Sequence, residues 1–183
     1  MHLVLENGKY YAFAETADAS QAVSVQPVMA STKNDKYTCV QNLYHNDGQG
    51  LDYPFWKCFA SSATNNFWWF YTSNLGIQGN GDLFCIEPIS VTKIDIATPV
   101  GTFAEPNYYP SKIQFMTSTD GGTWVSSGDF THNGNNAWTC TPTRNGKFNY
   151  FRIQVTARTN YAQIGRITFT GTGSNSLILR GVI

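Results

Sequence analysis

Short apolar stretches separated by turn-forming residues recur along almost the whole of this 183-residue chain. In the segment 151–155, Phe-Arg-Ile-Gln-Val, apolar and polar residues alternate one by one, the period that places neighbours on opposite faces of a strand. Gly, Asn and Asp clusters follow at short intervals, and no long window shows the period of a helix. The pattern predicts an all-β fold, an antiparallel β-sandwich of the jelly-roll kind.

The expected strands of this body lie at 37–42, 55–60, 67–72, 82–86, 91–97, 112–117, 137–141, 150–157 and 163–170. Tight turns are expected at 46–48, 79–81, 120–122 and 133–136, where Gly, Asn and Asp tolerate positive φ or bond their own backbone. Residues 14–24 are small and polar, which predicts a connector or one short helix.

Apolar, β-prone segments stand at both ends of the chain. Asn7-Gly8 predicts a two-residue hairpin turn between strands at 2–6 and 9–13, in a register that pairs Glu6 with Lys9. A flexible linker then precedes an apolar run at 177–183. That run could add a strand to the hairpin of its own chain or to a neighbouring chain, and both alternatives stay open. The residues expected to bind a partner are Leu3, Leu5, Tyr10, Leu177, Leu179 and Ile183.

Composition excludes several classes of function. Twelve Lys and Arg balance twelve Asp and Glu, without the basic cluster that binding to nucleic acid requires. No apolar run is long enough for membrane insertion, and the start lacks the features of a signal peptide. The four cysteines are widely spaced among apolar neighbours, which favours buried thiols over disulfides or a zinc site. We expect a hairpin and connector at 1–25, a sandwich at 26–172 and a linker with an apolar segment at 173–183.

Three stretches, in the right order, resemble the discoidin or coagulation-factor C-type domain. Residues 27–32 read Pro-Val-Met-Ala-Ser-Thr, and Trp-Lys-Cys-Phe at 56–59 then leads to Phe-Trp at 67–68, similar to the family's opening. Residues 113–124 resemble the family's strand and its Ser-x-Asp-Gly-x-x-Trp turn, the most specific of the three. Residues 150–153 and 163–167 resemble its paired closing strands. The resemblance covers 26–172 and implies a galactose-binding-like sandwich.

The resemblance also implies structural roles. Trp68 and Trp124 are expected in the core between the sheets, and Arg152 along a sheet face with its stem packed and its head in water. Many members hold a calcium ion with an acidic residue after an Ala-Phe pair and a Glu in the closing strand. This chain has Ala60 and Arg166 there. Because Ca²⁺ needs about six to eight oxygen ligands, we expect no bound calcium. We also expect no other metal and no cofactor.

No pattern in the sequence predicts catalysis. His2, His45 and His132 have no Ser or Cys in a nucleophile motif beside them. The loops instead carry aromatic rings beside amides and carboxylates, as sugar recognition requires, although packing of the loops is the alternative role for these tyrosines. The residues expected to bind a ligand are His45, Asp52, Tyr53, Tyr108, Tyr109, Arg158 and Tyr161.

Copies resembling this chain occur in tail, fibre and decoration proteins of bacteriophages, and the opening motifs are most similar to those. The resemblance therefore implies a non-catalytic structural or attachment protein of a phage particle, with other virion proteins as partners in an oligomeric assembly. Its expected location is the virion, assembled in the host cytoplasm. Two alternatives stay open: a glycan-binding module that recognises host-surface receptors, and an accessory subunit of a glycoside-processing enzyme.

Overall fold

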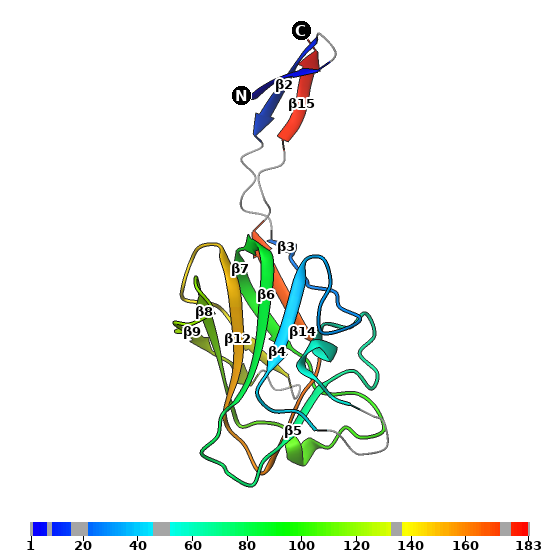
Figure 1. Cartoon of the computed structure of the whole chain (residues 1–183), viewed down its shortest axis with the longest axis vertical. Coiled ribbons are helices and arrows are strands. Elements are labelled where there is room, and N and C mark those ends of the chain that lie inside the picture. The colour runs from blue at the N-terminus through cyan, green and yellow to red at the C-terminus, as the bar shows by residue number, and fades with distance from the viewer. Residues whose placement is uncertain are drawn as a thin grey trace.

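The structure is a computed structural model that describes residues 2–6, 9–15, 22–45, 52–132, 137–172 and 177–182, with side chains for 25–45, 52–132 and 137–171. Within these residues two antiparallel sheets pack face to face (Figure 1). The first has the order β10-β11-β7-β14-β3 and the second the order β4-β6-β12-β8-β9. The predicted all-β sandwich is confirmed.

The strands of the first sheet are β3 (Ala22–Ser24), β7 (Val91–Ile96), β10 (Thr131–His132), β11 (Trp138–Cys140) and β14 (Ile167–Thr172). Those of the second are β4 (Tyr37–Gln41), β6 (Gly79–Ile89), β8 (Lys112–Ser118), β9 (Val125–Asp129) and β12 (Phe148–Ala157). A two-stranded ribbon pairs β5 (Trp68–Tyr71) with β13 (Tyr161–Ile164), and the 3-10 helices are η1 (Phe55–Phe59) and η2 (Pro106–Tyr108).

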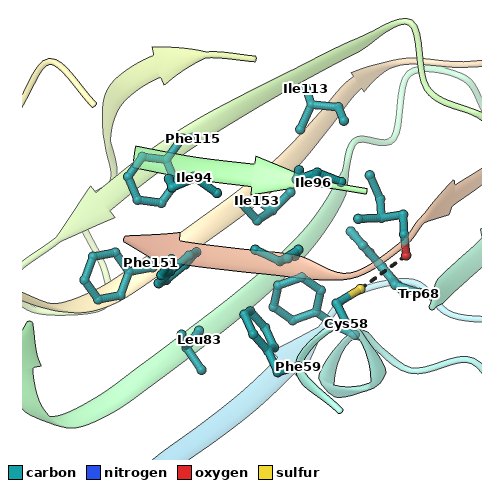
Figure 2. Close-up of a cluster of buried hydrophobic side chains, with 14 of the residues drawn as sticks. Cys58, Phe59, Trp68, Leu83, Ile94, Ile96, Ile113, Phe115, Phe151 and Ile153 are labelled. Atoms are coloured by element: carbon teal, nitrogen blue, oxygen red, sulfur yellow. Dashed lines mark hydrogen bonds between the residues drawn. The ribbon is translucent and has the colours of Figure 1, made fainter. Parts of the chain in front are cut away.

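One continuous hydrophobic core fills the space between the two sheets (Figure 2). Phe115 of β8, Phe151 of β12 and Phe169 of β14 meet there with ring centroids 5.6–6.3 Å apart. The alternation in β12 delivers Phe151, Ile153 and Val155 to this core, as the sequence predicts. Cys39, Cys58, Cys85 and Cys140 are buried free thiols, which confirms that expectation, and burial raises the pKa of Cys85 to about 12.

The segment predicted as a strand at 55–60 is the 3-10 helix η1, so that prediction is wrong. Pro54 precedes it, and local bonds run from Lys57 N to the Pro54 carbonyl and from Ala60 N to the Lys57 carbonyl. The helix buries Phe55, Cys58 and Phe59 on one face, a spacing of three and four residues that a strand does not use.

Two other predicted elements are also wrong. The turn expected at 79–81 is the beginning of β6, where a Cβ on Gly79 would lie 2.2 Å from Phe70 and one on Gly81 2.3 Å from Phe55. These glycines therefore allow close packing and make no turn. The strand expected at 163–170 is two strands, β13 and β14, which belong to different sheets.

The two described parts of segment 14–24 are strands, and 16–21 lie outside the described residues. Ala14 and Glu15 belong to the strand β2 (Lys9–Glu15), and residues 22–24 form β3 beside β14. The turns expected at 46–48 and 133–136 lie outside the described residues. The turn at 120–122 is confirmed, since Asp120 Oδ1 accepts hydrogen bonds from the backbone N–H groups of Gly122 and Thr123 at 2.8 and 2.7 Å.

The prediction that Trp68 lies in the core between the sheets is confirmed, since its side chain has no exposed surface. The same prediction for Trp124 is wrong. Trp124 is half-buried, and the guanidinium of Arg152 lies 4.1 Å from its ring centroid. Arg152 is fixed on that face by a bidentate pair with Asp82, at 2.6 and 2.7 Å. A cation held in this way offers the indole ring a stable partner outside the core. The guanidinium of Arg152 is therefore paired with the Asp82 carboxylate, whereas the sequence predicted that it lies in water.

The two ends of the chain form a sheet of their own, with the order β1-β2-β15. β1 (His2–Glu6) and β2 (Lys9–Glu15) pair in the predicted hairpin register, with Glu6 opposite Lys9. β15 (Leu177–Val182) pairs with β2 of the same chain, as in the first of the two alternatives for the apolar end. Figure 1 shows this terminal sheet beyond the β3 end of the sandwich, with β5 at the opposite end.

Candidate functional site

Strand β5 carries aromatic side chains on both of its faces. Trp68 and Phe70 are fully buried in the core, and the Trp68 Nε1–H donates to the Leu43 carbonyl at 2.8 Å. Because neighbours in a strand point to opposite faces, Trp69 and Tyr71 lie on the other face of β5. Trp69 is half-buried and Tyr71 is 44% exposed. This outer face carries a cluster of aromatic rings.

Five rings gather at this rim of the sandwich, and we call them the rim cluster: His45, Trp69, Tyr71, Tyr108 and Tyr161. Tyr161 lies between two other tyrosines, with centroids 4.5 Å from Tyr108 and 4.8 Å from Tyr71. Trp69 contacts Tyr108 and Tyr161 at 6.2 Å and His45 at 4.2 Å. These separations are those of favourable aromatic pairs, so the rings support one another as one unit.

Backbone hydrogen bonds fix the cluster from three segments that are distant in sequence. His45 N donates to the Trp69 carbonyl at 2.7 Å, Trp69 N to the Tyr53 carbonyl at 3.1 Å, and Tyr53 N to the His45 carbonyl at 3.2 Å. On the other side, β13 places Tyr161 opposite Tyr71 and Gln163 opposite Trp69. The main chain around Trp69 is therefore held on both sides, which orders the ring that it carries.

Three of the seven residues predicted to bind a ligand, His45, Tyr108 and Tyr161, belong to the rim cluster. Tyr53 lies beneath it, only 2% exposed, with its ring 4.9 Å from Phe67 and 5.1 Å from Trp69. Tyr53 therefore supports the cluster from below. Asp52 is exposed beside it, and its carbonyl accepts a hydrogen bond from Lys57 Nζ.

The remaining two predicted residues have other partners. Arg158 Nη2 donates to the Ile77 carbonyl at 2.6 Å, its guanidinium lies 5.3 Å from the Phe70 ring centroid, and burial lowers its pKa. The charged group of Arg158 is therefore bound to the loop that follows β5, at Ile77. Tyr109 is half-buried and meets Trp138 of β11 at 5.9 Å, edge to face.

Sequence reasoning missed Trp69 and Tyr71, the members that β5 itself supplies. The signal was present, because a core position for Trp68 places the residues on either side of it on the opposite face of the strand. It was hidden because all of 67–71, Phe-Trp-Trp-Phe-Tyr, is aromatic, so that no polar residue marks the outer face.

The rim cluster offers both apolar surface and polar groups. The exposed face of Tyr71 can cover the C–H surface of a sugar ring, and the tyrosine hydroxyls and His45 can exchange hydrogen bonds with sugar hydroxyls. Trp69 Nε1 is buried and has no acceptor within the described residues. Such a donor is costly to leave unpaired, so a ligand oxygen that reaches it would be favoured.

The residues at the calcium position that the sequence resemblance implies do not fit this ion. Ala60 has no side-chain oxygen, and Arg166 Nη1 already donates to the Ser61 carbonyl at 3.4 Å. A guanidinium cation thus contacts the carbonyl of the loop residue that follows Ala60. Elsewhere among the described residues, no three His, Cys, Asp or Glu side chains are grouped to hold a metal ion.

Two open cavities, of about 440 and 360 Å³, lie away from the rim cluster. They share Asp35, Lys36 and Tyr37, and the second also has Glu87 and the exposed Ile86 in its wall. Their walls provide one aromatic ring, that of Tyr37. The rim cluster, with five rings joined by pairwise contacts, has the more specific geometry for a ligand. Over the described stretches, no helix has the length and apolar character that crossing a bilayer requires.

The fold is an antiparallel β-sandwich that solved F5/8 type C domains and family 32 carbohydrate-binding modules share. No family model matches the sequence, and no curated protein matches it.

Solved structures share this fold at low sequence identity. The module CpGH89CBM32-5 from Clostridium perfringens, in complex with GalNAc-β-1,3-galactose, has a TM-score of 0.58 at 12% identity over 73% of this chain and 94% of its own. The family 32 carbohydrate-binding module of Clostridium perfringens NanJ, in complex with galactose, has 0.57 at 14% over 73% and 93%. An F5/8 type C domain from Bacteroides fragilis has 0.58 at 13% over 75% and 93%.

Proposed function

We propose that this chain is a non-catalytic glycan-binding module that holds neutral carbohydrate at the rim cluster. The observation that supports this most strongly is the packed set of aromatic rings around Trp69, at one rim of a fold whose similar structures include galactose and GalNAc-β-1,3-galactose complexes. Rings that are already ordered bind a sugar face at a low cost in conformational entropy.

The electrostatics around the cluster favour a neutral ligand. The guanidinium of Arg158, the nearby cation predicted to bind a ligand, is held by the Ile77 carbonyl and the Phe70 ring. Lys57 Nζ donates to the Asp52 carbonyl and lies over the Tyr53 ring, so its charge is already engaged within the protein. The equal number of acidic and basic residues in the chain gives no long-range attraction to charged glycans.

A glycan array with the full chain tests the proposal, followed by titration calorimetry with the bound sugar. Trp69→Ala is expected to weaken binding by about tenfold or more, because it removes the ring that His45, Tyr108 and Tyr161 contact. Trp124→Ala is the matched control, since it also deletes a half-buried tryptophan, but one that stacks on Arg152. Equal losses in the two variants, or no sugar bound by the wild type, would contradict the proposal.

A role in attachment is the second part of the proposed function. The terminal sheet joins both ends of the chain outside the sandwich, and its edge strands β1 and β15 each leave one side without a partner strand among the described residues. Leu3, Leu5 and Tyr10 of β1 and β2, with Leu177 and Leu179 of β15, remain the residues proposed to bind a partner; Ile183 lies outside the described residues. We propose a larger assembly, such as a phage particle, as this partner. The three similar structures above carry no virion name, so the virion setting rests on the sequence resemblance alone.

A further inference from the structure

The side chain of Gln163 is completely buried, with 0% of its surface exposed, although it lies on the same face of β13 as Tyr161. Its Nε2–H donates to the Phe103 carbonyl at 2.7 Å, and its Oε1 accepts from the backbone N–H of Glu105 at 2.8 Å. One primary amide therefore satisfies two backbone groups of the segment 103–105. Among the described residues, this segment pairs with no strand.

This segment leads directly into η2. Tyr108 N donates to the Glu105 carbonyl at 2.9 Å, which fixes the helical turn that begins where Gln163 binds. The same turn places the ring of Tyr108 4.5 Å from Tyr161 and 6.2 Å from Trp69. Gln163 thus connects β13, which carries Tyr161, to the segment that carries Tyr108.

A second amide holds the other end of the segment. Asn65 Oδ1 accepts from Thr102 N at 3.1 Å, and Asn65 N donates to the Val100 carbonyl at 2.8 Å. Asn65 is exposed, so water can replace its side-chain bond, whereas no water reaches the buried amide of Gln163. The position of η2 therefore depends more strongly on Gln163.

We propose that Gln163 is a positioning residue of the rim cluster: its amide holds residues 103–108 so that Tyr108 completes the ligand site. Only a side chain with both a donor and an acceptor at this distance can serve both backbone groups. Leu offers neither, and an ionised Glu offers no donor to the Phe103 carbonyl. The effect on sugar binding rests on the proposed function, but the clamp on η2 does not.

Hydrogen exchange in the absence of sugar tests the clamp. In Gln163→Leu the backbone amide of Glu105 is expected to exchange at least about tenfold faster than in the wild type, because its buried acceptor is gone. Gln114→Leu is the control for the change of residue type: it removes an exposed bond to Asp129 in β9 and should leave Glu105 unchanged. In the wild type, the side-chain amide protons of Gln163 are expected to be protected. Free exchange of these protons overturns the clamp even if no variant folds.

Binding of GalNAc-β-1,3-galactose then separates positioning from general destabilisation. Gln163→Leu is expected to weaken binding about as much as Tyr108→Ala, and the double variant no more than either, since both act through one ring. Additive losses would overturn the positioning role. If the wild type binds no sugar while Glu105 exchange rises as expected, the proposed function fails and the clamp stands. If sugar binds and Glu105 exchange is unchanged, the clamp fails and the proposed function stands.

Discussion

At the scale of single residues, polar side chains that satisfy backbone groups explain much of how the loops are held. Asp120 accepts bonds from Gly122 N, Thr123 N and the Ser118 hydroxyl, and Gly121 adopts a φ of 73°, which glycine tolerates without strain. The turn most specific to the sequence resemblance is thus built by one carboxylate and one glycine. The same logic gives Gln163 and Arg166 their roles at the other end of the sandwich.

The Asp120 turn predicts a dependence of stability on pH. Hydrogen bonds from Thr123 N, Gly122 N and Ser118 lower the pKa of Asp120 to about 2, below the value of about 3.9 expected in an unfolded chain. Its contribution is therefore fully present above about pH 4 and lost as the pH falls through about 2. At pH 6 we expect Asp120→Asn to have a lower melting temperature than the wild type. At pH 2 we expect the two melting temperatures to be the same, as measured by circular dichroism. A melting difference that is the same at both values would contradict this account.

The contact of Arg166 with the loop predicts that calcium does not change the stability of the fold. Because Ala60 supplies no oxygen and Arg166 donates to the Ser61 carbonyl, the melting temperature of the wild type should be unchanged by calcium or by a chelator. Arg166→Ala is expected to lower it by a few degrees at most, since one exposed bond is lost. Lys147→Ala, which also removes a cation but at an exposed position, is the control. A rise in melting temperature with added calcium would show that the ion binds after all.

At the scale of elements, turn chemistry and alternation predicted most of the sheet strands to within a few residues, because β4, β7, β8, β11 and β12 bury one face against the core. The errors have local causes. Pro54 begins a 3-10 helix at a place where apolar residues had suggested a strand, and Gly165 allows a break between β13 and β14, since a Cβ there would lie 2.3 Å from the Ala97 carbonyl oxygen. Close packing of this kind leaves no periodic signal in a sequence.

The candidate site was predicted only in part for a similar reason. Loop position and residue type were enough to indicate His45, Tyr108 and Tyr161. The central ring, Trp69, depends on which face of β5 meets the core, and five consecutive aromatic residues conceal that choice. Gln163 could not be found at all, because its partners Phe103 and Glu105 are brought to it only by the tertiary fold.

The terminal sheet gives a prediction at this scale. Deleting residues 173–183 removes β15 and leaves β1 and β2 as a two-stranded hairpin, which is marginally stable in water. The sandwich has its own core, so its melting temperature should change little and sugar binding should persist, while attachment to a partner should be lost. Size-exclusion chromatography with a candidate partner checks the last point. Unimpaired attachment by the truncated chain would rule out β15 as the docking element.

At the scale of the whole molecule, the two proposed functions lie at opposite ends of the sandwich. The ribbon of β5 and β13 lies at one end and the terminal sheet at the other (Figure 1). A ligand at the rim cluster is thus separated from any partner held by β1 or β15. Such an arrangement suits a module that presents a sugar-binding surface away from the body to which it is attached.

The most direct test of this account is a nuclear magnetic resonance titration of the full chain with GalNAc-β-1,3-galactose. We predict that the largest shift changes occur at the Trp69 indole N–H and at the backbone amides of His45, Tyr71, Tyr108 and Tyr161, with none at Tyr37 beside the two cavities. Changes centred on Tyr37, or no changes with this sugar and none with any glycan of the array, would contradict the assignment of the rim cluster as the ligand site.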